Sequence, residues 1–108
     1  MAGMRNKVIA GLLMGLTSLS SIAEEQRDPC LWVSNLAESI MKSRQNEAPM
    51  AKVMGVFSGG DAPDEIKKVM KDMVIDAYES PAFSSDANKA KAVAQFQNEM
   101  YLACVKAM

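Results

Sequence analysis

Residues 61–79 read DAPDEIKKVMKDMVIDAYE, and this stretch carries the clearest helical periodicity in the chain. Its apolar side chains recur three and four positions apart, as Ile66, Val69, Met70, Met73, Val74, Ala77 and Tyr78. That spacing places them on one face of an α-helix. Asp61 is expected to cap this helix, and Ser80-Pro81 to end it, because proline disfavours a helical residue before it. The stretch therefore predicts an amphipathic helix over residues 62–79.

Three further segments show helical periodicity, and residues 24–108 contain no alternating strand pattern. Asp28 as N-cap and Pro29 in the first turn predict a helix over 28–45. Pro49 suits the start of a second helix over 49–58, which Gly59-Gly60 ends, and Ser84 or Ser85 caps a last helix over 85–106. We therefore expect an all-α fold, a small four-helix up-down bundle.

The two cysteines, Cys30 and Cys104, lie in the first turn of the first expected helix and the last turn of the fourth. If short loops make neighbouring helices antiparallel, four helices return the chain to its starting end, so these two turns become neighbours. Neither cysteine belongs to a C-x-x-C pair or a zinc-ligand spacing. The sequence therefore predicts a Cys30–Cys104 disulfide that staples the ends of the bundle.

Residues 1–23 have the pattern of a secretory signal peptide. Arg5 and Lys7 form a positive region, residues 8–16 a short apolar region, and Ser21-Ile22-Ala23 offers small side chains at the cleavage positions. The apolar run is far shorter than the roughly 20 residues that a spanning helix needs. We expect cleavage before Glu24, no stable membrane span after cleavage, a single helical domain over 24–108, and a periplasmic or secreted location.

The composition argues against several classes of function. The chain has no histidine, which removes the commonest general base and the commonest metal ligand. Residues 24–108 carry 13 acidic and 10 basic side chains without a long run of either sign, which argues against a nucleic-acid partner. No catalytic triad, paired-carboxylate or phosphate-loop motif occurs. We therefore expect no catalytic residues, no metal site, no cofactor and no enzymatic activity.

Methionine is unusually frequent, with seven after the expected cleavage site. Most are expected in the core, because the flexible thioether fills irregular gaps. Two pairs, Met50 with Met54 and Met70 with Met73, have the spacing to present sulfur to Cu(I) from one helical face. Exposed methionines would instead suit a protein-binding surface. The candidate partner-binding residues are Met50, Met54 and Phe57 on the short second helix, together with Arg44, Trp32 and Tyr101.

The chain resembles small exported helical proteins with two cysteines, of unknown function, from proteobacteria and their phages. The likeness rests on Cys30, residues 41–45, Pro49-Met50, Ala77-Tyr78 with Pro81, and Phe96 through Tyr101 to Cys104. It implies an exported helical domain and no particular activity. The chain is more loosely similar to periplasmic acid-stress chaperones, which are also small, helical and held by one disulfide.

These observations predict an exported, non-enzymatic protein-binding or regulatory module of the bacterial envelope, whose partner is an envelope or periplasmic protein. A chaperone-like periplasmic stress protein and a methionine-based copper-handling protein are the alternatives.

Overall fold

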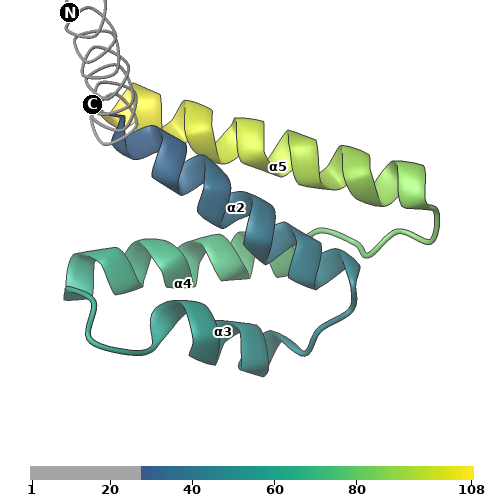
Figure 1. The fold of residues 1–108 in the computed structure, drawn as a ribbon, viewed down its shortest axis with the longest axis horizontal. Coiled ribbons are helices and arrows are strands. Elements are labelled where there is room, and N and C mark those ends of the chain that lie inside the picture. The colour runs from purple at the N-terminus through teal and green to yellow at the C-terminus, as the bar shows by residue number, and fades with distance from the viewer. Residues whose placement is uncertain (1–27) are drawn as a thin grey trace, which may run out of the picture.

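The computed structural model describes residues 28–108 and forms four helices over that range, shown in Figure 1. They are α2 (Pro29–Gln45), α3 (Met50–Ser58), α4 (Asp64–Glu79) and α5 (Asp86–Ala107). Residues 28–108 contain no strand, so the expected all-α class with four helices is confirmed. The predicted signal peptide lies outside the described residues.

Two of the three expected N-cap side chains form a capping hydrogen bond, and the third does not. The Asp28 carboxylate accepts from the Cys30 backbone N–H at 3.0 Å, and the Ser85 hydroxyl accepts from the Asn88 N–H at 3.1 Å. In contrast, α4 begins after Pro63 with no side-chain cap, so the prediction of a cap by Asp61 is wrong. A capping oxygen must come from the N-cap residue itself, and Pro63 occupies that position.

The helices pack as two pairs, α2 with α5 and α3 with α4, which are joined mainly by the packing of α2 against α4. Helix α2 runs antiparallel to α5 along most of its length, and α3 lies beside α4, as Figure 1 shows. Helix α2 also packs against α4, whereas α4 and α5 make few direct contacts with each other. Helix α2 is therefore the central element, with α4 and α5 on its two flanks.

The core lies where α2 meets the other three helices. Its buried side chains are Ala37, Ile40, Met41, Val53, Met73, Val74, Ala77, Val93 and Phe96. The apolar stripe of α4 is fully buried only in its second half, since Val69 is 43% exposed whereas Met73, Val74 and Ala77 are buried. Helix α4 makes few contacts with α5, so no helix within residues 28–108 covers Val69.

The disulfide predicted between Cys30 and Cys104 is present, with 5.6 Å between the two Cα atoms. It joins the first turn of α2 to the last turns of α5, and Cys30 is completely buried. The Met108 sulfur lies 3.4 Å from the Cys30 sulfur. Neither sulfur carries a proton in the disulfide-bonded protein, so this is a packing contact rather than a hydrogen bond. None of the helices α2 to α5 is long and apolar enough to cross a membrane.

Candidate functional site

An open apolar groove of about 440 Å³ lies between α4 and α5 and is the strongest candidate for a binding site in the described part of the chain. We call it the α4–α5 groove. It is lined by Val33 of α2, by Val69, Asp72, Met73 and Asp76 of α4, and by Met100, Ala103, Cys104, Ala107 and Met108 of α5.

The groove follows from the way the helices pair. Helices α4 and α5 both pack on α2 but diverge from each other, and Figure 1 shows the start of α4 well separated from the end of α5. The space between them exposes apolar side chains of both helices, and Val33 of α2 also lines it. The volume falls in the range of about 300–1,000 Å³ that is typical of ligand sites. Among residues 28–108, the packing of α4 and α5 on α2 therefore leaves the apolar side chains that line this groove without a covering element.

Methionines from two helices give the groove an adaptable surface. Met73 of α4 is buried, Met100 of α5 is half-buried, and Met108 at the end of α5 is 79% exposed. An unbranched thioether side chain can change its rotamer to fit differently shaped apolar partners. The groove can therefore adjust to an incoming surface without a change in the backbone.

The side chains proposed for partner binding on α3, Met50, Met54 and Phe57, differ in their exposure. Met54 and Phe57 pack against the core, while Met50 is partly exposed at the first turn of the helix. Val53 is the buried residue of α3, and Val56 is its most exposed apolar side chain. Helix α3 therefore uses most of its apolar stripe to attach to the rest of the fold.

Trp32 of α2 and Tyr101 of α5 lie near the disulfide, whereas Arg44 lies at the opposite end of α2. Trp32 is 45% exposed, so its indole is available to a partner. The Tyr101 hydroxyl donates to the Asp28 carboxylate at 3.1 Å, and this hydrogen bond raises the pKa of Tyr101. The structure therefore does not gather the six proposed partner-binding residues into one site.

Arg44 has a structural partner at the opposite end of α2. Its Nε donates to the Ser80 carbonyl oxygen at 2.9 Å, and its guanidinium lies 5.1 Å from the centre of the Tyr78 ring. The Tyr78 hydroxyl donates to the Ala48 carbonyl oxygen, and burial raises its pKa. These contacts tie the α4–α5 connection and the α2–α3 connection together, so Arg44 anchors a loop.

Gln45 has a structural role that the sequence did not predict. Its side chain is almost fully buried, at 2% exposure, and bonds to backbone groups of the α4–α5 connection. Its backbone carbonyl also accepts from the Lys89 ammonium group. The sequence gives no direct signal for this role, because a glutamine at a helix end is usually solvated.

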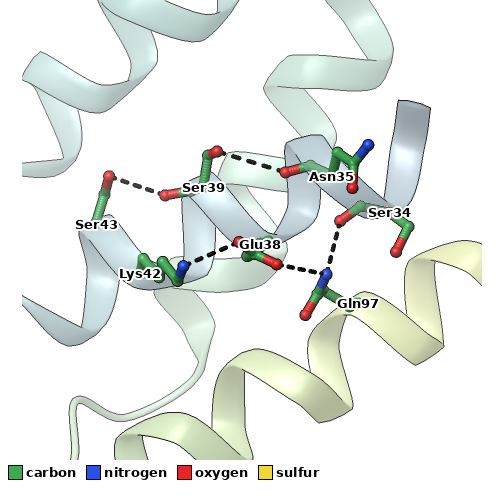
Figure 2. A network of polar contacts seen from close by, with 7 residues as sticks. All are labelled: Ser34, Asn35, Glu38, Ser39, Lys42, Ser43 and Gln97. Atoms are coloured by element: carbon green, nitrogen blue, oxygen red, sulfur yellow. Dashed lines mark hydrogen bonds and ion pairs between the residues drawn. The ribbon is translucent and has the colours of Figure 1, made fainter. Parts of the chain in front are cut away.

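A polar network joins α2 to α5, as Figure 2 shows. The Gln97 amide donates to the Glu38 carboxylate at 3.0 Å, and Lys42 forms an ion pair with the same carboxylate at 2.9 Å. The Lys42 contact lowers the pKa of Glu38. Ser39 and Ser43 bond back to carbonyl oxygens one turn earlier in α2. This network fixes α5 on α2 and contributes nothing to the groove.

Comparison with known proteins finds no matching family, no matching curated protein and no matching solved structure. Within residues 28–108 no cluster of three or more His, Cys, Asp or Glu side chains could hold a metal ion.

Proposed function

We propose that this protein is an exported, non-enzymatic protein-binding module of the bacterial envelope, and that the α4–α5 groove receives an amphipathic helix of another envelope or periplasmic protein. The observation that carries the proposal is the groove itself, an open apolar surface flanked by two helices. Burial of apolar surface is the main driving force of protein association. A helix laid between two helices is a recurrent solution for covering such a surface.

The shape of the groove favours a protein segment over a small enclosed ligand. Among the residues that line it, Val69 is 43% exposed and Met108 is 79% exposed, so the groove is open to solvent. An isolated apolar molecule in it would keep much of its own surface in water. A helix with apolar residues at i, i+3, i+4 and i+7 would cover the exposed side chains continuously.

The proposed location rests on the disulfide and on the predicted leader. Disulfides form and persist in oxidising compartments such as the bacterial periplasm. The proposal takes the four helices as an up-down bundle whose first and last helices are stapled, which holds the α5 wall of the groove against α2. The resemblance to small exported two-cysteine proteins of proteobacteria and their phages also supports export.

Site-specific crosslinking in the periplasm of a Gram-negative host tests the proposal. One variant carries a photo-crosslinking amino acid at Val69 in the groove, and a matched variant carries it at Val56, which is exposed on α3 and lies outside the groove. We expect a defined partner to crosslink at Val69 and not at Val56. The purified partner should bind the unmodified protein and lose binding to Ala103→Glu, which places a charge in the groove.

Two results would contradict this assignment of the groove. Crosslinking at Val56 alone, with partner binding lost in Met50→Gln/Met54→Gln, would move the contact to α3. Undiminished binding of the purified partner to Ala103→Glu would exclude the groove as the contact surface. The thermal stability of each variant should be measured alongside, since Met54 packs against the core.

The copper-handling alternative has one observation in its favour, because the groove brings together Met73, Met100 and Met108 from two helices. Thioethers are soft ligands that suit Cu(I). Anaerobic Cu(I) titration against a competing chelator tests it. A stoichiometric site that is lost in Met100→Leu would support copper binding, whereas our leading proposal expects no such site.

A further inference from the structure

The two long walls of the α4–α5 groove differ in charge. The α4 wall carries Asp72 and Asp76, four positions apart, which is about one helical turn. Both carboxylates are exposed, and the only ion pair within residues 28–108 is the one between Lys42 and Glu38. Among the described residues that line the groove there is no lysine or arginine. The α4 wall of the groove therefore carries two acidic side chains that form no ion pair within the described residues, beside an apolar floor.

The α5 wall carries no charged side chain, and beside Met100, Cys104 and Met108 it includes two alanines. Ala103 and Ala107 lie four positions apart on it, and both are exposed. Methyl side chains allow the axis of a neighbouring helix to come close, because interaxial distance depends on the side chains at the contact. A helix in the groove would therefore approach α5 closely and keep longer side chains on the side that faces α4.

From this asymmetry we infer that the helix which occupies the groove carries Lys or Arg residues one turn apart along the edge facing Asp72 and Asp76, and small residues along the edge facing Ala103 and Ala107. This inference rests on the proposed function and adds the chemistry and the orientation of the partner helix.

Electrostatic complementarity would act mainly on selectivity. Cations on the partner helix would reach exposed carboxylates at the rim, where ion pairs are screened and individually weak. A partner helix with acidic residues on that edge would instead place like charges side by side, which disfavours it further. The apolar floor alone would accept either helix. The acidic edge favours the basic helix over the acidic one, and it fixes which edge of the bound helix faces α4.

Two synthetic peptides test the inference on the mature, disulfide-bonded protein. Both form the same amphipathic helix with a leucine stripe and alanines along one edge, and they differ only in carrying lysines or glutamates along the other edge. Binding is measured by fluorescence anisotropy at low and high salt. We expect the lysine peptide to bind about tenfold more tightly at low salt, with the difference shrinking as salt is added.

Reversing the charges of Asp72 and Asp76 tests whether the preference for the lysine peptide arises in the groove. In Asp72→Lys/Asp76→Lys the preference should invert in favour of the glutamate peptide. The control Asp61→Lys/Glu79→Lys changes the net charge equally at two exposed positions outside the groove and should keep the preference for lysine. Melting temperatures of both variants check that they fold. An inversion in the control variant as well would assign the effect to net charge and overturn the inference.

The remaining outcomes separate this inference from the proposal on which it rests. Equal binding of both peptides, competed by the partner captured through Val69, would overturn the charge assignment and leave the helix-binding function standing. Binding of neither peptide, together with no capture at Val69, would overturn both. Sedimentation in the absence of peptide gives one more result: a change of oligomeric state in Asp72→Lys/Asp76→Lys would identify a second copy as the occupant and overturn the assignment to a separate partner.

Discussion

The side-chain oxygen of Gln45 accepts a hydrogen bond from the backbone N–H of Phe83 at 2.9 Å, across 38 positions of sequence. The same side chain donates from its nitrogen to the Pro81 carbonyl oxygen at 3.0 Å. Both halves of one buried amide are therefore used to hold the connection between α4 and α5 against the end of α2. Because this connection sets where α5 begins, Gln45 helps to fix the spacing of the two groove walls.

We expect Gln45→Met to destabilise the protein by about 2 kcal/mol, since a side chain of similar length would leave the Phe83 N–H and the Pro81 carbonyl without their partners. Chemical denaturation measures this change. Hydrogen exchange should show faster exchange of the Phe83 amide. The matched control is Ser43→Ala, which removes an exposed hydroxyl bonded within α2 and should change stability by less than about 0.5 kcal/mol. Equal stability of the two variants would show that the buried amide has no such role.

Removal of the disulfide should have a larger effect. Cys30 and Cys104 are 74 positions apart, and the chain-entropy model gives about 4 kcal/mol for closing a loop of this length. In a domain of this size that loss should lower the melting temperature of Cys30→Ala/Cys104→Ala by more than about 10 °C. Calorimetry with and without reductant measures it. Reductant should lower the melting temperature of the native protein and leave that of the variant unchanged.

The core where α2 meets α4 should be sensitive to loss of volume. Ile40 is completely buried, so Ile40→Ala should cost about 3 kcal/mol through lost burial and the cavity left behind. Val56→Ala is the control, because Val56 is 68% exposed on α3 and its truncation should be nearly neutral. Urea denaturation of both variants compares the two effects. A comparable loss in both would contradict the burial pattern described above.

Tyr101 should titrate above its ordinary pKa of 10.0, because its hydroxyl donates to the Asp28 carboxylate. The protonated phenol is favoured in the folded protein, so this contact stabilises the fold below pH 10 and the stabilisation is lost as the pH rises through the folded-state pKa. Ultraviolet titration of Tyr78→Phe, which leaves Tyr101 as the only tyrosine, measures the pKa. Asp28→Asn keeps a good helix cap and should return the pKa towards its ordinary value. An unchanged pKa would exclude the Asp28 contact as the cause.

The leader predicts one further result that does not depend on the described residues. Mass spectrometry of the protein expressed in a Gram-negative host should find a periplasmic chain that begins at Glu24. A chain that retains Met1 in the membrane fraction would contradict the predicted cleavage and, with it, the proposed location.

Local chemistry in the sequence is enough to predict the helices. The spacing of apolar residues, the Asp28 and Ser85 caps, and the stops at Gly59 and Ser80-Pro81 act within one or two turns of the chain, so their effect does not depend on distant residues. The Cys30–Cys104 pairing was also predicted from the sequence, on the expectation that four helices joined by short loops return the chain to its starting end, and the disulfide is present. The Asp61 cap was wrong because Pro63 occupies the capping position at the start of α4.

Only the tertiary structure decides which part of each apolar stripe remains uncovered. Val69 belongs to the same periodic stripe as Val74, yet it is exposed while Val74 is completely buried. The difference arises because α4 and α5 both pack on α2 and then diverge, an angle that depends on how side chains of three helices interlock. The same long-range packing buries Gln45 and places the partly buried Phe57 against the core. The sequence by itself therefore determined the helices and their staple, whereas the packing angles between helices decided where the groove opens.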